Sequence, residues 1–273
     1  MDALTHGRAT TRAVQSASQP GGAAQHRVLP QEVPVAMVFD GSSAAVMLAT
    51  PADLEDFAYG FALTEGFISG PADIAGFEVV PHGPGIEARF WLSQDRSAAV
   101  TARRRSMAGP VGCGLCGLES LEAATREVPR LPPGALAFSR EEILNACEDL
   151  RAHQPLHDET HAVHGAGFML PGQGIVAARE DVGRHNALDK LIGSVVRGAG
   201  SMDGGAVVIT SRISVELVQK CAVAGCGAIV AVSAPTAYAM DVADAAGIAL
   251  VQGRRGRFEV FTHAQRLGDA CFR

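Results

Sequence analysis

Two cysteines separated by two residues form the part of the sequence best suited to chemistry. Cys113 and Cys116 have glycines on both sides, and apolar residues at helical spacing follow from Leu118 to Val128. The pair is therefore predicted to lie at the start of a helix, where free amides and the helix dipole favour a thiolate, and arginines 103–105 could add positive charge. A thiolate in a glycine-flanked loop can act as a nucleophile that carries a group between two partners.

Three other interpretations of this pair stay open. Buried structural thiols would be inert, although the flanking glycines would bury them poorly. Half of a four-cysteine zinc site would need a second close pair, whereas four residues separate Cys221 from Cys226. A thioredoxin-like dithiol would be expected early in the chain, directly after a strand. Cys147 and Cys271 have no partner nearby in the sequence and are predicted to be ordinary small side chains.

A polar cluster between two apolar segments is the second candidate site. Asp181 is predicted to cap the helix that follows it, which places Arg184, His185 and Asn186 in the first helical turn. Donors that converge at a helix N-terminus hold anions. A solvated first turn would explain Asp181 but not its three neighbours, so the cluster predicts a binding role.

Three histidines could bind a metal if they shared one face of a helix. His157, His161 and His164 are spaced by four and three residues. The residues from His164 onward are typical of a strand, however, and in extended structure residues 161 and 164 face opposite ways. A metal site is therefore the weaker interpretation, and we predict none.

Strands and helices alternate regularly in the last third of the chain. Strands are expected at 207–210, 228–233, 248–252 and 258–262, with helices at 214–224 and 236–246. This order predicts a parallel sheet with right-handed crossovers, and ligands bind beyond the carboxyl ends of such strands. The predicted contacts there are Ser211, Arg212, Ser233, Thr236 and the stretch Gln252, Gly253, Arg254, Arg255, Gly256 and Arg257. The arginines and glycines of that stretch suit a phosphate, and a charged hairpin is the alternative.

The first half of the chain is predicted to hold smaller elements. Residues 1–27 have no apolar period and are interpreted as a disordered leader. A hairpin is expected around Asp40-Gly41, a helix after Asp53, and two strands at 77–81 and 86–92. Ser139 and Glu142 are predicted to form a capping box after a proline break. We therefore predict an α+β domain over 28–135 and an α/β domain over 136–273.

Composition excludes several classes of protein. Of the 273 residues, 47% are hydrophobic and 19% charged, and the net charge is −6. This balance excludes wholesale disorder and a polycation for nucleic acid. No apolar run approaches the roughly 18–20 residues of a membrane span, and the N-terminus lacks a secretory signal. The cytoplasm is the expected compartment.

Six motifs in this order resemble those of FdhD-type sulfur carrier proteins, the formate dehydrogenase accessory sulfurtransferases. The resemblance runs from about Val33 to Leu267. Its motifs are DLEDFAYGFALTEGFI (53–68), CGLCG (113–117), REDVGRHNALDKLIG (179–193), TSRISVELVQKCAVAG (210–225), VSAPTAYAMDVA (232–243) and THAQRL (262–267).

The resemblance implies a fold and a set of roles. The larger domain would be similar to cytidine deaminase, with three layers and a mostly parallel sheet. Cys113 would carry a persulfide with Cys116 assisting, and His164 matches a family histidine while His161 replaces a family glycine. The stretch from Gln252 to Arg257 falls on the family's contact with the molybdenum (or tungsten) bis-guanine-dinucleotide cofactor, so a guanine nucleotide such as GDP could occupy the same site.

The implied partners are a cysteine desulfurase as sulfur donor, formate dehydrogenase as the enzyme served, and a second copy in a homodimer. Two functions of other classes remain as alternatives. A cofactor-binding chaperone would deliver the cofactor without moving sulfur, and would depend on the 254–257 arginines rather than on the cysteines. A zinc-dependent deaminase would need a His-x-Glu and a Pro-Cys-x-x-Cys motif, which the sequence lacks.

Overall fold

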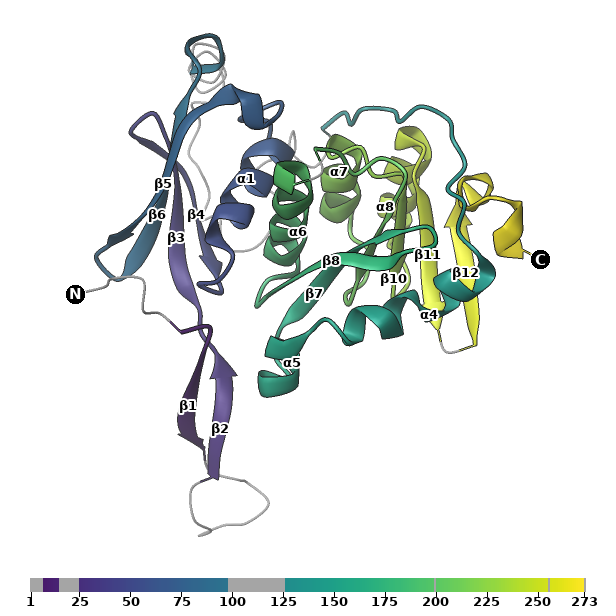
Figure 1. Ribbon diagram of the computed structural model, residues 1–273, viewed down its shortest axis with the longest axis horizontal. Helices are drawn as coiled ribbons and strands as arrows, with labels where there is room; N and C mark the ends of the chain where they lie inside the picture. Colours follow the sequence, from purple (N-terminus) through teal and green to yellow (C-terminus); the bar gives the residue numbers. More distant parts are fainter. Residues whose placement is uncertain (1–6, 15–24, 98–125, 199, 255, 273) are drawn as a thin grey trace.

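The computed structural model describes residues 7–14, 25–97, 126–198, 200–254 and 256–272 (Figure 1). Two sheets lie on either side of a group of helices, and a narrow two-stranded hairpin extends away from them. The predicted sulfur-carrying pair, Cys113 and Cys116, and the predicted cofactor contact Arg255 lie outside the described residues.

The first sheet has four strands in the order β4-β3-β6-β5. They are β3 (Val33–Phe39), β4 (Ser42–Ala49), β5 (Ile74–His82) and β6 (Gly85–Leu92). The predicted hairpin turn is confirmed: Asp40 and Gly41 both have positive φ, 49° and 76°, as a two-residue turn requires. Helix α1 (Leu54–Thr64) packs its apolar side on this sheet, where Phe39 stacks on Phe90 with ring centroids 4.9 Å apart.

The second sheet has six strands in the order β12-β11-β10-β9-β7-β8. They are β7 (His164–Leu170), β8 (Gly174–Asp181), β9 (Ala206–Ile209), β10 (Ala228–Ala231), β11 (Ala249–Arg254) and β12 (Arg257–Thr262). Strands β9, β10 and β11 are parallel, as predicted. The expectation of a mostly parallel sheet is wrong, because the β7–β8 and β11–β12 connections are short turns, which force antiparallel pairing, and β7 also runs antiparallel to β9.

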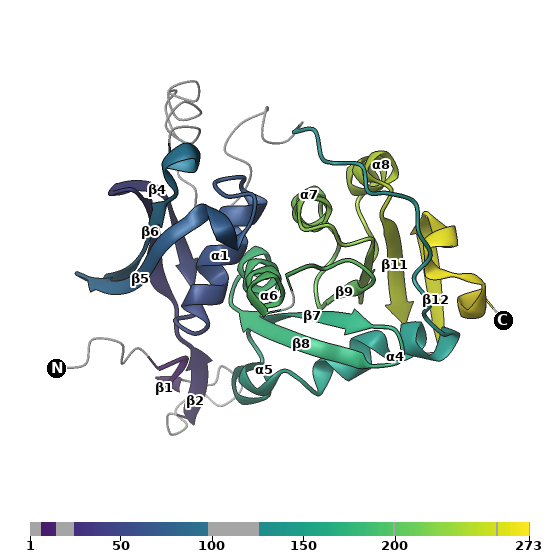
Figure 2. The same ribbon diagram turned by 45° about the horizontal axis from the view of Figure 1, so that its top comes forward.

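Helices cover both faces of the six-stranded sheet. Helices α6 (Arg184–Gly198), α7 (Val215–Val223) and α8 (Ala237–Ala246) lie on one face, and α4 (Arg140–Arg151) lies on the other (Figure 2). The predicted capping box is confirmed at the start of α4, where Ser139 Oγ accepts from Glu142 N and the Glu142 carboxylate accepts from Ser139 N. Short helix α5 (Pro155–Thr160) precedes β7, and 3-10 turns occur at Pro71–Asp73, Ala264–Leu267 and Asp269–Phe272.

The extended hairpin corrects the expectation of a disordered leader over residues 1–27. Within the described residues, β1 (Ala9–Val14) pairs antiparallel with β2 (Gln25–Pro30). All residues of these two strands are exposed or half-buried, so the strands have no apolar period by which the sequence could have revealed them. Arg8, just before β1, forms an ion pair with Glu159 of α5 at 2.7 Å, which ties the base of the hairpin to the second sheet unit.

The predicted domain boundary at residues 135 and 136 stays a prediction. The described chain on both sides of it runs along the second sheet unit. Leu131 N donates to Ala246 O, and Leu136 N donates to Arg266 O. No helix of the described ranges is long and apolar enough to cross a membrane.

Helices α1 and α6 join the two halves of the molecule, and their contact is called the α1–α6 interface here. Gly60 and Gly193 let the two backbones touch. A Cβ on Gly60 would lie 1.8 Å from Asp189 O, and one on Gly193 would lie 1.9 Å from Asp56 O. Any larger residue at either position would force the helices apart.

Charged groups are buried in and beside the α1–α6 interface, and each has partners. Lys190 Nζ lies 2.7 Å from Asp181 Oδ2, and both side chains are fully buried. Lys220 Nζ lies 2.9 Å from Asp189 Oδ2 and 2.8 Å from Glu65 Oε1. Burial disfavours the charged forms of Lys220 and Asp189. The negative charges of Asp189 and Glu65 outweigh this effect on Lys220, and its pKa is raised. The interface is therefore held by ion pairs as well as by close backbone contact.

Candidate functional site

Most of the predicted site residues lie along one edge of the six-stranded sheet, called the strand-end edge here. The carboxyl ends of β9, β10 and β11 lie at this edge together with the first residues of β7, α6, α7, α8 and β12. A bridge between Ile213 and Pro235 ties the loop after β9 to the loop after β10. The edge holds His164, Arg184, His185, Ser211, Arg212, Ser233, Thr236, Gln252, Gly253, Arg254, Gly256 and Arg257.

The arginine-rich stretch is a tight hairpin, which confirms the alternative interpretation of its shape. Arg254 pairs with Arg257 across β11 and β12, and Gly256 in the turn has a φ of 76°. Arg257 is exposed. The backbone of Gly256 therefore lies in the left-handed region, which glycine adopts without steric cost. The turn leaves Arg257 on the surface of the strand-end edge.

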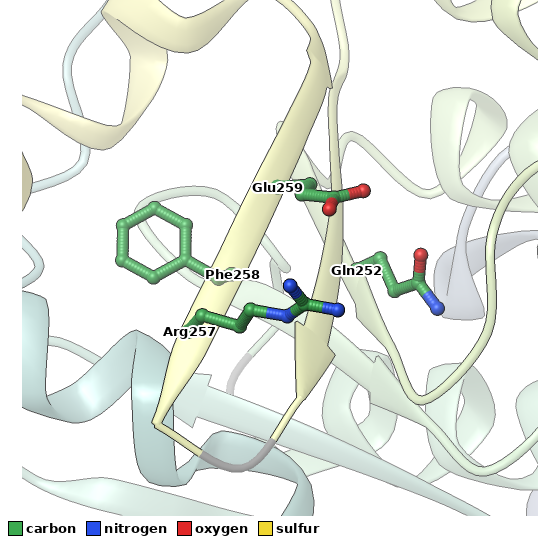
Figure 3. A pocket seen from close by; sticks show the side chains of 4 residues that line it. All are labelled: Gln252, Arg257, Phe258 and Glu259. Atoms are coloured by element: carbon green, nitrogen blue, oxygen red, sulfur yellow. The ribbon is translucent and has the colours of Figure 1, made fainter.

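Gln252 and Gly253 lie inside strand β11 rather than in the loop where the sequence placed them. Gln252 is 4% exposed and its Nε2 donates to Val232 O at 3.4 Å. A Cβ on Gly253 would lie 3.3 Å from Cys147 Sγ of α4. Gln252 lines a shallow hollow with Arg257, Phe258 and Glu259, where the Phe258 ring points away from the other three side chains (Figure 3).

The hydroxyls after β9 and β10 differ in what they already bind. Ser211 Oγ donates to the carbonyl of Arg212 at 3.0 Å, and the Arg212 side chain is exposed. Thr236 is the N-cap of α8, where its hydroxyl accepts from Ala239 N at 3.2 Å. Ser233 is half-buried. Arg212 is therefore the group of this set that solvent or a ligand reaches most easily.

The side chains of Asp181 and Asn186 point into the protein and form hydrogen bonds beside the α1–α6 interface. Asp181 is fully buried, and its Oδ1 accepts from Gly183 N at 2.8 Å and from Asn186 Nδ2 at 2.9 Å. Its Oδ2 accepts from Thr50 N at 2.9 Å and pairs with Lys190. The prediction that Asp181 caps α6 is wrong, because the helix begins at Arg184 and the Asp181 carboxylate accepts from Gly183 N and the Asn186 side chain rather than from a backbone N–H of the helix. All of these carboxylate contacts are internal. A cofactor contact for Asp181 or Asn186 stays a prediction.

Arg184, His185 and His164 gather on the α6 side of the edge. The pKa of His164 is lowered, first because its ring is half-buried and then because Arg184 and His185 place positive charge nearby. His164 is therefore held neutral, and Arg184 supplies the permanent charge. His185 Nε2 lies 3.9 Å from Glu216 Oε2, and this neighbour lowers the pKa of Glu216 to about 2.

Glu216 and Ser214 also lie at the strand-end edge, and the sequence did not predict them as candidate site residues. Ser214 is the N-cap of α7 and is 8% exposed, and Glu216 lies in the first turn of that helix. The signal was present, since a serine followed by an acidic residue directly after a buried strand is typical of a helix start. That helix start was predicted, but its nearness to His185 depends on tertiary contacts.

The three histidines do not share a helical face. His157 lies in α5, His161 has a left-handed backbone with φ of 54° just after that helix, and His164 begins β7. The His157 and His161 rings meet edge to face with centroids 5.5 Å apart, and His157 Nδ1 lies 3.3 Å from Val163 O. Local packing accounts for His157 and His161.

The four described thiols are unsuited to nucleophilic chemistry. Burial raises the pKa of Cys147 and of Cys226 to about 11, and it raises that of Cys221 well above its ordinary value. Burial also raises the pKa of Cys271. Each is therefore protonated and weakly reactive at neutral pH. Among the cysteines of the sequence, Cys113 and Cys116 are left as candidates for transfer chemistry.

Two arginines fix the described ends of the chain on either side of residues 98–125. Arg96 Nε donates to Phe67 O at 2.6 Å, and its Nη2 donates to Gly66 O. Arg126 Nη2 donates to Thr64 O at 2.8 Å. All three carbonyls lie at or just beyond the C-terminal end of α1, where the helix dipole favours cations. Both ends are thus attached to the helix that forms the α1–α6 interface.

Comparison with known proteins gives consistent matches over nearly the whole chain. The FdhD/NarQ family matches residues 30–268. Sulfur carrier protein FdhD of Agrobacterium fabrum is 53% identical over 242 residues, which cover 88% of this chain and 89% of that protein. The protein of the same name from Bordetella petrii is 45% identical over 248 residues, covering 90% and 89%. A crystal structure of a proposed formate dehydrogenase accessory protein from Desulfotalea psychrophila has a TM-score of 0.71 and 25% identity, covering 95% of this chain and 98% of that one.

Proposed function

The chain belongs to the FdhD/NarQ family, and from this premise we propose that it is a sulfur carrier that serves the maturation of formate dehydrogenase. Relatives named as sulfur carrier proteins match about nine-tenths of the chain, and this match is the observation that carries the proposal. The solved structure with the same fold is described as a formate dehydrogenase accessory protein, which supports the same role.

The sulfur is proposed to travel on Cys113. The Cys113 thiolate attacks the outer sulfur of a persulfide on a cysteine desulfurase. A new S–S bond forms at Cys113, the donor's S–S bond breaks, and the donor cysteine leaves as a thiolate. Attack of Cys116 on the inner sulfur of Cys113 would release the carried sulfur as hydrosulfide and leave a disulfide, which a thiol reductant resets. The raised pKa values of the other four thiols support this choice of residues.

The strand-end edge is proposed to hold the sulfur acceptor, the molybdenum bis-guanine-dinucleotide cofactor, as a bound substrate. Arg212 and Arg257 are exposed there, and Arg184 adds a third guanidinium beside the start of α6. Guanidinium groups pair bidentately with phosphate, and helix N-termini present free amides to anions. A dinucleotide has several phosphates, so an edge with cations at separate places suits it better than a single cationic loop. The cytidine deaminase likeness and a homodimer remain parts of this proposal.

Intact-protein mass spectrometry tests the sulfur-carrying step. The purified protein is incubated with a cysteine desulfurase and cysteine, and compared with Cys113→Ala and Cys116→Ala. We expect an adduct of about 32 Da, the mass of one sulfur, on the wild type and on Cys116→Ala but not on Cys113→Ala. Cys147→Ala is the matched control and should keep the adduct. Absence of the adduct from both the wild type and Cys116→Ala, which cannot release the carried sulfur, would favour a chaperone that binds the cofactor without carrying sulfur.

A further inference from the structure

Segments from distant parts of the sequence meet where helix α1 ends, at a place called the α1 end here. It consists of Thr64, Glu65, Gly66 and Phe67. Arg96 donates to the carbonyls of Phe67 and Gly66, and Arg126 donates to the carbonyl of Thr64 at 2.8 Å. Arg126 Nη1 also lies 3.7 Å from Glu65 Oε2. The described residues on the two sides of 98–125 are therefore attached to the same helix end.

The α1 end is built to accept these two cations. The last carbonyls of a helix have no partner inside it, and the helix dipole gives this end a partial negative charge. Gly66 has a φ of 75° and turns the chain out of the helix, with its own N–H donating to Leu63 O. The carbonyls that remain are those that Arg96 and Arg126 occupy, so both arginines complete the helix end rather than cover a neutral surface.

The α1 end is itself bonded to helices α6 and α7. Lys220 Nζ of α7 donates to Thr64 Oγ1 at 2.9 Å and to Glu65 Oε1 at 2.8 Å. Asp189 of α6 accepts from Thr64 Oγ1 at 2.8 Å and from Lys220 Nζ at 2.9 Å. Both helices begin at the strand-end edge. Buried, charge-assisted bonds therefore hold the α1 end in a fixed position relative to that edge.

The two halves of the proposed sulfur transfer place different demands on the position of Cys113. Loading is an encounter with a separate desulfurase, which approaches from solution. Delivery takes place within one complex, because the acceptor is bound at the edge of the same chain. The rate of such an internal step depends on the effective concentration of the carried group near its acceptor, which the attachment of the connecting segment sets.

We propose that Arg96 and Arg126 are positioning residues for sulfur delivery. By attaching both ends of the segment that carries Cys113 to the α1 end, they keep the carried sulfur near the strand-end edge. This inference rests on the proposed function. The delivery step is the one given above: Cys116 attacks the inner sulfur on Cys113, hydrosulfide leaves, and a thiol reductant reduces the disulfide that remains.

Separate measurement of loading and delivery tests the proposal with the full chain. Loading is the rate at which the protein gains about 32 Da from a cysteine desulfurase and cysteine, followed by intact-protein mass spectrometry in the Cys116→Ala background, which retains the sulfur. Delivery is the rate at which formate oxidation appears when the protein with both cysteines is mixed with desulfurase, cysteine, a thiol reductant, the molybdenum bis-guanine-dinucleotide cofactor and formate dehydrogenase that lacks it.

Arg126→Gln and Arg96→Gln each release one end of the segment. We expect either change to slow delivery by about tenfold or more and to leave loading within about twofold of the wild type, because only the internal step depends on position. Arg89→Gln is the matched control. Arg89 is also a partly exposed arginine paired with carboxylates, but its partners Glu87 and Glu78 lie on the four-stranded sheet. It should keep both rates.

The outcomes separate this inference from the function on which it rests. A variant that keeps the wild-type delivery rate removes its arginine from the positioning role, and the inference is wrong if both variants keep it. It is also wrong if loading and delivery fall by the same factor, since a general structural defect would do that. If the wild type gains no sulfur, the proposed function is overturned together with this inference. Retained loading shows that a variant is folded, so misfolding could not imitate the expected result.

Discussion

The α1–α6 interface and the strand-end edge both concentrate charged residues, but they use them in opposite ways. At the interface, Lys190 and Asp181 are fully buried and paired at 2.7 Å, and Lys220 is satisfied by Asp189 and Glu65. At the edge, Arg212 and Arg257 are exposed, and the buried Arg184 Nε makes no hydrogen bond. Charged groups whose hydrogen-bonding atoms all have partners within the protein indicate a structural interface. Charged groups that lack such partners indicate a place where a ligand could bind.

This contrast between the α1–α6 interface and the strand-end edge also divides neighbouring residues of one sequence motif. In the segment from Arg179 to Gly193, Asp181, Asn186 and Lys190 bond within the protein at the α1–α6 interface, whereas Arg184 and His185 lie at the strand-end edge. These residues differ because of their positions on helix α6. Residues on its inner side contact α1 and the sheet, whereas its first turn lies at the strand-end edge.

Loss of the buried cation should have the largest effect on stability. Lys190→Met leaves Asp181 as a buried charge without its ionic partner, and we expect about 3–5 kcal/mol less free energy of unfolding. Urea denaturation followed by circular dichroism measures this. Adding Asp181→Asn should restore part of the loss, because the uncompensated charge is then gone. A Lys190→Met variant as stable as the wild type would show that the interface does not depend on its ion pairs.

Closing the glycine contact should have the next largest effect. In Gly193→Ala the new Cβ would lie 1.9 Å from Asp56 O, so α1 and α6 must separate, at a cost of about 1–3 kcal/mol. Gly198→Ala, in the same helix but with no atom within 4 Å of its Cβ, should be neutral or slightly stabilising. Thermal denaturation of the two variants compares them directly. Equal melting temperatures would contradict the close approach of the two helices.

The pH dependence of the edge should be the smallest effect. The neighbouring His185 lowers the pKa of Glu216 to about 2, below its ordinary value of 4.5. Its ionised form therefore stabilises the fold above about pH 4.5, and that contribution is lost as the pH falls toward 2. The site is partly open to solvent, so we expect only about 1 kcal/mol. Urea midpoints at pH 5 and pH 3 should differ less for Glu216→Gln than for the wild type. If the wild type and Glu216→Gln showed the same pH dependence of stability, Glu216 would not be its cause.

Much of the local structure could be predicted because its causes lie close together in the sequence. The Asp40-Gly41 turn, the capping box at Ser139 and the alternation of strands and helices from β9 to β12 each depend on residues a few positions apart. The chemical candidates also came from the sequence, since the glycine-flanked pair at Cys113 and Cys116 and the polar start of α6 are visible without any fold. The β1–β2 hairpin was missed because its strands are exposed and carry no apolar period.

Only the tertiary structure decided which polar residues belong to the joint and which to the edge. Asp181 reaches Thr50 across 131 positions, and Gly60 touches Asp189, contacts that no local pattern records. The same long-range packing brings Ser214 and Glu216 beside His185. Sequence pattern determines which residues can do chemistry and which elements carry them, because propensity and capping act locally. Burial determines which of those residues remain available to a ligand, because it depends on segments that meet only in the folded chain.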